Sequence, residues 1–437
     1  MAELVKKYQQ YEEYKETGIE WLGKIPSSWR TGSLRWMIDI ASGESLPSNC
    51  EKEYSKENQF PVVGGNGVMG FSNKVNTADA AIAVGRVGAL CGNIHSIDYD
   101  SWITDNALKI SKWNKFSKDF LVYLLKTANL NDLASKTAQP LITGEQVKSL
   151  KVVLLPIAEQ KKIANFLDHE TAQIDTLIEK QQTLIQLLKE KRQAVISHAV
   201  TKGLNPDAPM KDSGVEWLGE VPEHWVVSPL KLYIDTRKGV AFKSADFTDL
   251  GVRVVKASDI KEKTIRQSDV FLPVYFSETY PKAILSEGDI VISTVGSTPD
   301  VKNSAVGQIG MVPVELDGSL LNQNTVVFTP RNNILENLFL FYLIQTDVYR
   351  DHLDLNAHGT ANQASLNVSD MLNFTFARPS FKEQSEISEH IIKVNNSFDA
   401  LEKNCVTAIQ LMQERRTALI SAAVTGKLDV RGWRASE

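Results

Sequence analysis

The stretch that decides the fold is EQKKIANFLDHETAQIDTLIEKQQTLIQLLKEKRQAVISHAVTKGL, residues 159–204. It returns at residues 383–428 as EQSEISEHIIKVNNSFDALEKNCVTAIQLMQERRTALISAAVTGKL, at a constant offset of 224 residues. Each copy follows a proline, Pro156 or Pro379, after which 46 residues pass without glycine or proline. A proline near the start and a glycine after the end of such a segment are typical of a helix. Both copies are therefore predicted to be long helices.

The apolar residues of both predicted helices recur at spacings of three and four, which is typical of a coiled-coil or bundle seam. Two unrelated amphipathic helices, the simpler interpretation, would explain neither the equal lengths nor the shared offset. A duplicated chain favours a pseudo-twofold molecule with antiparallel helices, in which Glu170 would lie near the Arg415 end and help to fix the register. The seam residues are Ile163, Leu167, Ile174, Leu177, Leu184, Leu188 and Val195 in the first copy and Ile387, Ile391, Val394, Phe398, Leu401, Cys405, Ala408, Met412 and Leu419 in the second.

A second repeat precedes each helix. GIEWLGKIPSSW, residues 18–29, returns as GVEWLGEVPEHW, residues 214–225, at an offset of 196, so the second half has 28 more residues between this cassette and its helix. The tryptophans of the two cassettes are interpreted as packing anchors between a globular segment and the helices; they are Trp21, Trp29, Trp217 and Trp225. The predicted boundaries are 1–23 (N-terminal segment and first cassette), 24–155 (first globular segment), 156–204 (first long helix), 205–219 (linker and second cassette), 220–378 (second globular segment), 379–428 (second long helix) and 429–437 (C-terminal tail).

Both globular segments alternate short β-rich runs with turn residues. FPVVGGNGVMGF (60–71) and GDIVISTVGS (288–297) are rich in valine and isoleucine and are bounded by Gly, Asn, Asp or Pro. Such runs predict strands of small mixed or mainly antiparallel sheets, followed here by helical stretches. The expected fold class is α/β (α+β), with two domains built on small mixed sheets, separated by two long helices that form an antiparallel coiled coil.

The composition of the chain limits which classes of protein it can belong to. The chain has 437 residues, 43% of them hydrophobic, with no apolar run long enough to span a membrane and no signal-peptide pattern at the N-terminus. Three scattered cysteines, Cys50, Cys91 and Cys405, suit reduced core residues and a cytoplasmic location. The net charge of −5 requires any phosphate-binding surface to be local. Residues 24–155 are net positive and residues 220–378 net negative, so the second segment must concentrate its cations on one face or rely on partners.

Motifs of catalysis are weak or absent. GNGVMG (65–70) spells a dinucleotide-binding pattern, but the residues that follow it are poor helix formers and rich in turn residues, so a loop between strands is favoured. No phosphate-binding P-loop, no amino-methyltransferase motif and no zinc-ligand spacing occur, and PDVK (299–302) lacks the partner residues of a nuclease. The sequence therefore indicates a binding protein that needs no cofactor or metal of its own.

The order of motifs as a whole resembles a known family. GxEWLGxxPxxW, a variable segment, then LP…EQ…I and R…I…AVT, all present twice, is similar to the specificity subunit of type I restriction–modification enzymes. The resemblance covers essentially the whole chain and implies a non-catalytic subunit that reads a bipartite, asymmetric site in double-stranded DNA with two target recognition domains. It also implies that the helices dock two methyltransferase subunits, which would bind S-adenosylmethionine, and that restriction subunits can join them. Residues 142–156 and 366–379 resemble the strand that closes each recognition domain.

Candidate DNA contacts follow from the chemistry of base reading, in which Arg or Lys pairs with guanine and Asn or Gln with adenine. The alternative for each residue is a turn-capping or solvated role. The candidates are Asn66, Lys74, Arg86, Asn106 and Lys109 in the first segment and Lys256, Ser297, Asn303, Asn322, Gln323, Asn324 and Asn362 in the second.

Two other classes of function stay open at this point. A structural coiled-coil adaptor could use both globular segments to bind protein or glycan, and a shared apolar groove would favour it. A nuclease or methyltransferase would need a catalytic cluster assembled from residues far apart in the sequence. Cations gathered on one face of both segments would favour DNA.

Overall fold

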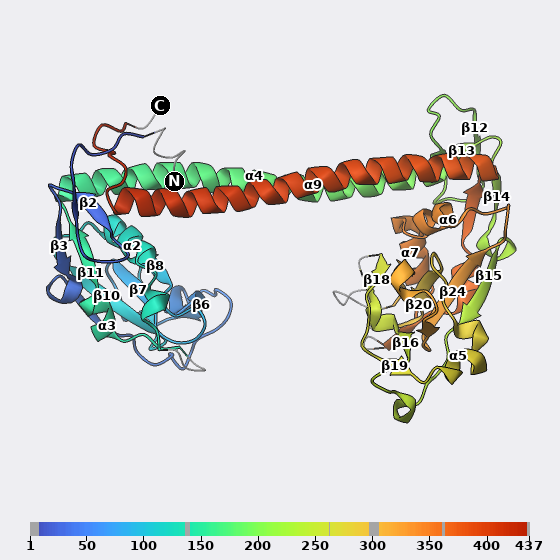
Figure 1. Cartoon of the computed structure of the whole chain (residues 1–437), viewed down its shortest axis with the longest axis horizontal. Helices are drawn as coiled ribbons and strands as arrows, with labels where there is room; N and C mark the ends of the chain where they lie inside the picture. The colour runs from blue at the N-terminus through green and yellow to red at the C-terminus, as the bar shows by residue number, and fades with distance from the viewer. Residues whose placement is uncertain (1–7, 136–139, 262, 297–305, 361–362, 435–437) are drawn as a thin grey trace. The chain divides into compact units, whose positions relative to one another are not determined.

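The computed structural model describes residues 8–135, 140–261, 263–296, 306–360 and 363–434. The chain divides into two compact units, Met1–Gln182 with Cys405–Glu437 and Thr183–Asn404. Two long helices, α4 (Ile157–Lys202) and α9 (Phe381–Val424), each contribute to both units (Figure 1). The prediction of long helices in the two repeated segments is confirmed.

The first unit contains a four-stranded sheet in the order β4-β10-β7-β8 and a three-stranded sheet in the order β6-β5-β9. Helix α2 packs between the four-stranded sheet and α4, where Phe120 and Leu124 join Ile163 and Phe166 in one buried cluster. Its elements are β1 (Tyr14–Glu16), β2 (Lys24–Pro26), β3 (Arg30–Ser33), β4 (Ile38–Ser42), β5 (Phe60–Gly64), β6 (Gly67–Ser72), β7 (Ala81–Gly85), β8 (Ile94–Ile97), β9 (Trp102–Ile103), β10 (Ala107–Trp113), α2 (Lys118–Thr127), α3 (Gly144–Ser149) and β11 (Lys151–Leu154).

The second unit contains a six-stranded sheet in the order β15-β24-β20-β22-β18-β17 and a three-stranded sheet in the order β19-β16-β23. Helices α6 and α7 carry its aromatic core residues, including Phe339 and Tyr349, toward Ile387 and Ile391 of α9. Its elements are β12 (Met210–Asp212), β13 (Glu220–Pro222), β14 (Val226–Pro229), β15 (Ile234–Lys238), β16 (Val252–Val255), β17 (Ile260–Lys261), β18 (Thr264–Ile265), β19 (Phe271–Leu272), α5 (Tyr275–Thr279), β20 (Ile290–Ser293), β21 (Val295–Gly296), β22 (Ile309–Met311), β23 (Leu320–Leu321), β24 (Thr325–Pro330), α6 (Asn337–Leu343), α7 (Asp347–Leu355), β25 (His358–Thr360), β26 (Gln363–Ser365), α8 (Val368–Leu372) and β27 (Thr375–Arg378).

The two units repeat one topology although their globular segments have little sequence in common. Strands β4, β10, β7 and β8 correspond to β15, β24, β20 and β22, and the β6-β5-β9 sheet corresponds to β19-β16-β23. In both three-stranded sheets one pair is parallel, β5 with β9 and β16 with β23. Strands β11 and β27, which lie in the segments expected to close each domain, pair antiparallel with β3 and β14. The additional length of the second half contains strands without a counterpart, such as β17, β18 and β21.

Each cassette anchors its globular segment to the long helices through a tryptophan. Trp29 and Trp225 are fully buried. The indole N–H of Trp29 donates to Oε1 of Glu159 at 3.1 Å, and that of Trp225 donates to Oε1 of Glu383 at 3.1 Å. The repeated glutamate at the start of each helix is therefore the acceptor for the repeated tryptophan, which explains why both residue types recur.

The glutamine that follows each glutamate ties the helix to the globular segment. Oε1 of Gln160 accepts the backbone N–H of Ser117 at 2.8 Å, and Oε1 of Gln384 accepts that of Glu336 at 2.7 Å. Both glutamines are fully buried, and their amide groups also donate to backbone carbonyls. The repeated Glu-Gln pair therefore connects the start of each long helix to its globular segment by the same hydrogen bonds.

Within each unit the two long helices are antiparallel. In the first unit Nε of Arg416 donates to Oδ1 of Asp175 at 2.8 Å. In the second, Lys189 pairs with Glu402 at 3.3 Å and Arg192 pairs with Asp399. In every pair the two residue numbers add to the same total, as expected of antiparallel helices in one register. The ion pair near the predicted Glu170–Arg415 contact is Asp175–Arg416, and Glu170 accepts a hydrogen bond from the Tyr8 hydroxyl.

The apolar repeat is buried toward the ends of the helices and partly exposed in the middle of each, although Cys405 in the middle of α9 is buried. Ile163 and Ile387 are fully buried, whereas Leu177, Leu184 and Leu401 are 49%, 42% and 49% exposed. The prediction that these three leucines lie in a buried seam is wrong. Near the ends the globular segments add a second layer of contacts, whereas a pair of helices alone covers only a narrow stripe.

Candidate nucleic-acid interface

In each globular segment the loop before the central strand is held by the same backbone hydrogen bonds. The 104–106 loop precedes β10, and the 322–324 loop precedes β24. The N–H of Thr104 donates to the carbonyl of Val63 at 2.9 Å, and the N–H of Asn322 donates to that of Val255 at 2.8 Å. The next residue of each loop donates to the segment that follows β4 or β15. Two dissimilar sequences thus build one loop.

A glycine in each segment makes this arrangement possible. A Cβ atom at Gly43 would lie 2.2 Å from the carbonyl oxygen of Thr104, and one at Gly239 would lie 1.8 Å from that of Asn322. No side chain fits at either distance, so both positions require glycine for close backbone approach. The two glycines stand 196 residues apart, the same offset as the cassettes.

A third strand brings its end residue to the same loop. Arg86 follows β7, and its N–H donates to the carbonyl of Asn106 at 2.9 Å. Thr294 follows β20, and its N–H donates to the carbonyl of Asn324 at 2.8 Å. The carbonyls of Arg86 and Thr294 then accept N–H groups from the segments that lead into α3 and α8, at 2.9 and 2.8 Å. We call these two equivalent sites the loop edges of the first and second globular segments.

Three of the five candidates in the first segment meet at its loop edge. Asn66 and Asn106 are exposed, and Arg86 is half-buried. A Cβ atom at Gly65, which precedes Asn66, would lie 2.9 Å from the Asn106 carbonyl and 3.7 Å from the Arg86 nitrogen, so the three residues are neighbours. Oδ1 of Asn66 accepts a weak hydrogen bond from Asn93 at 3.5 Å.

The other two candidates of the first segment have different surroundings. Nζ of Lys109, on β10, donates to the backbone carbonyl of Asn76 at 3.0 Å. Lys74 is exposed on the connection between β6 and β7, where its backbone N–H donates to Oγ of Ser72 at 3.1 Å. The Lys109 amine therefore has an internal acceptor, whereas the Lys74 amine extends from a turn.

In the second segment the described candidates surround the loop edge. Gln323 and Asn324 are exposed, and Asn324 adopts a left-handed φ of 66° that asparagine tolerates well. Oδ1 of Asn322 accepts the N–H of Gln323 at 2.7 Å, so this side chain shapes the loop. Lys256 directly follows β16, the strand that Asn322 bonds. Ser297, Asn303 and Asn362 lie outside the described residues.

The sequence reasoning missed residues that line a cavity at the second loop edge. This cavity of about 240 Å³ is bounded by Lys238, Thr294, Asn324 and Asn367, among others. In the first segment the Arg86 side chain reaches the corresponding place, where its Nη1 donates to Oγ of Ser42 at 3.0 Å. Ser42 and Lys238 each precede the essential glycine, and the 196-residue offset could have identified Lys238 as a candidate.

A second polar hollow adjoins the first loop edge. A cavity of about 470 Å³ is lined by a set of amide and basic side chains, namely Asn93, His95, Lys126, Asn129 and Asn131. A ring nitrogen of His95 lies 3.3 Å from the carbonyl of Gly65, next to Asn66. Burial lowers the pKa of the Lys126 amine from its ordinary value. Amide and cationic groups of this kind suit contacts with base edges and phosphates.

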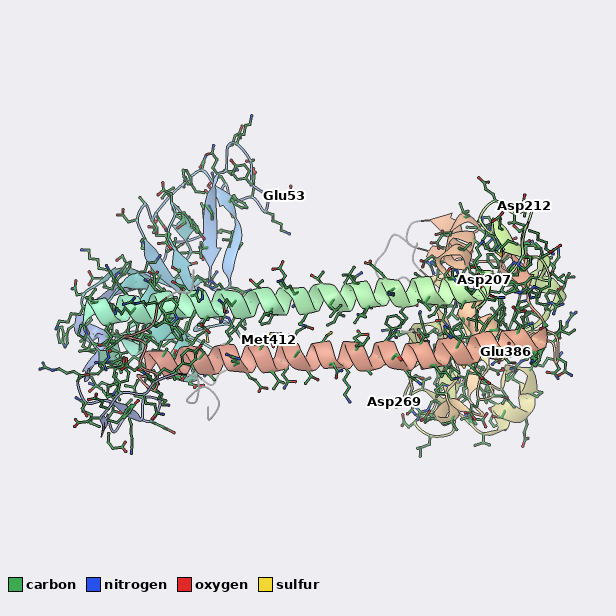
Figure 2. All side chains as sticks on the ribbon, turned by 90° about the horizontal axis from the view of Figure 1, so that it is seen from above. Glu53, Asp207, Asp212, Asp269, Glu386 and Met412 are labelled. Carbon is green, nitrogen blue, oxygen red and sulfur yellow. The ribbon has the colours of Figure 1, made fainter. Side chains whose placement is uncertain are left out.

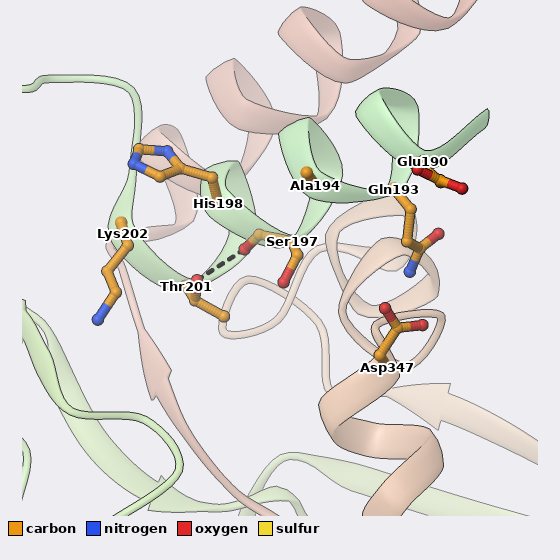
Figure 3. A pocket seen from close by; sticks show the side chains of 8 residues that line it. All are labelled: Glu190, Gln193, Ala194, Ser197, His198, Thr201, Lys202 and Asp347. Carbon is orange, nitrogen blue, oxygen red and sulfur yellow. Dashed lines mark hydrogen bonds between the residues drawn. The ribbon is translucent and has the colours of Figure 1, made fainter. Parts of the chain in front are cut away.

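No arrangement of catalytic groups is found among the described residues. Ser197, His198 and Asp347 line one pocket of the second unit, but His198 points away from the other two, and Thr201 donates to the Ser197 carbonyl (Figure 3). No cluster of three or more metal-ligating side chains occurs in the described part of the chain. None of the helices in that part is long and apolar enough to cross a membrane.

Comparison with known proteins gives the family. The model of the type I restriction modification DNA specificity domain matches residues 26–187 and 222–411, more than half of the chain. The chain therefore belongs to this family, and it carries the domain twice. It is 25% identical over 414 residues to the type I restriction enzyme MjaVIII specificity subunit of Methanocaldococcus jannaschii, covering 94% of this chain and 90% of that protein. It is 21% identical over 457 residues to the EcoKI specificity subunit of Escherichia coli, covering 94% and 92%.

Solved structures share the fold. A chain from work on complex assembly and conformational transition of the type I R-M system superposes with a TM-score of 0.65 at 14% identity, covering 92% of this chain and 98% of that one. The HsdS subunit from Thermoanaerobacter tengcongensis gives a TM-score of 0.51 at 16% identity, with the same coverage. The expected fold class, two recognition domains on small sheets combined with long helices, is confirmed.

Proposed function

We propose that this chain is the sequence-recognition subunit of a type I restriction–modification complex, without catalytic activity of its own. Each globular segment reads one half of an asymmetric, gapped site in double-stranded DNA. The observation that carries the proposal is the pair of loop edges, because one backbone framework is built twice and presents different side chains. A repeated framework with divergent side chains is what two half-sites of different sequence require.

The side chains at the loop edges have the chemistry of base reading. Arg86 carries the fork that pairs with guanine in the major groove, and the amides of Asn66, Asn106, Gln323 and Asn324 suit adenine. Lys238 and Lys256 would supply cations at the second edge for phosphate contacts, although residues 220–378 are net negative. Partner subunits would then provide much of the remaining phosphate binding for this half.

The long helices are proposed to dock two methyltransferase subunits, which bind S-adenosylmethionine, and restriction subunits would join the full complex. Apolar side chains that are half-exposed along these helices support this role, because such surfaces commonly mark sites of protein association. They are Leu177, Leu184, Leu187, Leu401, Val406 and Leu411. The boundaries 24–155 and 220–378 are retained as the proposed recognition domains.

The test is to express the chain with the methyltransferase subunit of its own system and to map methylated bases across the host genome. A gapped, asymmetric motif should appear only when both chains are present. The matched control replaces the chain with its Arg86→Ala, Gln323→Ala double variant, which leaves the left-handed position of Asn324 unchanged and should lose the motif. Methylation that does not depend on the chain would contradict the proposal, and a purified chain that methylates DNA alone would refute the non-catalytic role.

A further inference from the structure

One position on the long helices is covered in the first unit and open in the second. In the first unit Phe166 of α4 is fully buried, with the Tyr8 ring 5.2 Å away and the Trp433 ring 5.5 Å away, both edge-on. Tyr8 comes from the N-terminal segment and Trp433 from the C-terminal tail. The two ends of the chain therefore place aromatic side chains over this part of the helix pair.

The corresponding position in the second unit, 224 residues on, is His390, which is exposed. A groove of about 560 Å³ lies here. Its wall includes Leu204, which is 42% exposed, whereas its counterpart Leu428 is fully buried. Pro206 is also exposed, whereas its counterpart Val430 is buried. The groove is lined by Lys191, Ala194, Val195, His198, Ala199, Gly203, Leu204, Pro206 and His390.

The difference follows from how the chain runs. In the second unit the backbone continues from α4 through the turn at residues 205–208 to β12, and the described residues that line the groove include no Phe, Tyr or Trp. The residues of this turn, Asn-Pro-Asp-Ala, include no aromatic side chain. An apolar floor that is covered by aromatic rings in one copy is thus left open in the other.

The lining also defines the charge of an occupant. Its ionisable side chains are Lys191, His198 and His390, and no carboxylate is among the lining residues. A basic rim around an apolar floor favours an aromatic side chain carried on an acidic segment.

We propose that this groove receives an aromatic side chain from an acidic segment of a methyltransferase subunit, in the place that Tyr8 and Trp433 take in the first unit. The inference rests on the proposed function, since it names the docking site for a partner that function requires. It makes the two ends of the helix pair unequal. One methyltransferase copy docks with an aromatic insertion, and the other meets a surface that the chain has already covered.

The test uses the full chain and the purified methyltransferase subunit of its system, with the stoichiometry of the complex measured by native mass spectrometry. Pro206→Trp fills the groove from its own wall. Asp207→Trp is the matched control, because Asp207, which is labelled in Figure 2, is the next residue of the same turn and is not among the residues that line the groove. Wild type and the control should bind two methyltransferase copies, whereas Pro206→Trp should bind one of them at least about tenfold more weakly.

The outcomes separate the two proposals. If Pro206→Trp binds both methyltransferase copies fully, or if both variants lose binding equally, the proposal that the groove is a docking site is wrong. Either result leaves the proposed function unaffected. No binding of the methyltransferase by the wild-type chain would overturn the proposed function itself. Thermal unfolding checks that both variants keep the stability of wild type. Leu204→Ala, which shortens a side chain of the apolar wall without adding bulk, should also weaken the binding of one methyltransferase copy. The result then does not depend on a single substitution.

Discussion

Removing the Glu383 carboxylate is expected to destabilise the second unit by about 2–3 kcal/mol. Its Oε1 accepts the indole N–H of Trp225 at 3.1 Å, and its Oε2 lies 2.9 Å from a ring nitrogen of His224. Trp225 is fully buried, so Glu383→Ala leaves its N–H group without a protein acceptor, although the Glu383 side chain itself is partly exposed. A buried donor left unpaired costs roughly 1–3 kcal/mol, and a hydrogen bond to a charged acceptor contributes about 1.5–3 kcal/mol.

The assay is thermal unfolding followed by circular dichroism. For a unit of this size 1 kcal/mol corresponds to about 2–4 °C, so Glu383→Ala should lower the melting temperature of the second unit by roughly 5–10 °C. Glu383→Gln keeps an acceptor and should cost less than half as much. Combining Glu383→Ala with Trp225→Phe removes both partners, and the combined loss should fall short of the sum by about 1 kcal/mol. Additive losses, or a melting temperature unchanged in Glu383→Ala, would refute the role of this pair as an anchor.

Three further predictions concern the loop edges and the helix pair. Arg86→Ala should leave the melting temperature within about 2 °C of wild type while it relaxes one position of the methylated motif by about 1–3 kcal/mol, seen as methylation of new sites; an unchanged motif would exclude Arg86 from base reading. Gly239→Ala should weaken recognition of one half-site only and lower stability, because its Cβ would meet the Asn322 carbonyl; a fully stable variant would contradict the close approach. A double-mutant cycle on Asp175 and Arg416 should give a coupling free energy of only about 0.2–1 kcal/mol, because both side chains are partly exposed. A much larger value would contradict the interpretation of this ion pair as solvent-exposed.

The sequence predicted the elements whose patterns are long or repeated. The two helices could be placed because a 46-residue run without glycine or proline has few other structures. The buried tryptophans of the cassettes could be assigned to packing because they recur with the helices. Their acceptors could not be identified, since nothing in a sequence shows that Glu159 and Glu383 meet a side chain more than 100 residues distant along the chain.

The equivalence of the two globular segments was not visible in the sequence. Their shared framework consists of backbone hydrogen bonds, which many residue types can make, so it leaves almost no trace beyond Gly43 and Gly239. The exposure of Leu177, Leu184 and Leu401 was not predicted either, because spacing identifies an apolar stripe without showing which residues are covered. Leu184 and Ile387 fit the repeat equally well, and only the packing of the globular segments distinguishes them.

The candidate DNA contacts were also only partly predictable from the sequence. Asn66, Arg86 and Asn106 come from three separate segments and meet at one edge, which the base-reading chemistry of their side chains had favoured. Lys238 was missed because a lysine before a glycine carries no signal by itself, and only the 196-residue offset of the cassettes pairs its position with Ser42. For Lys109, whose amine has an internal acceptor, a contact with DNA stays a prediction.

The measurement that tests the central claim most directly is an exchange of recognition domains. Residues 24–155 are replaced by the corresponding segment of a specificity subunit that recognises a different half-site, and methylated bases are mapped in a host that also expresses the methyltransferase subunit. We predict that one half of the gapped motif changes while the other half and the spacing between them are preserved. A motif that changes in both halves, or that does not change, would contradict the assignment of one half-site to each globular segment.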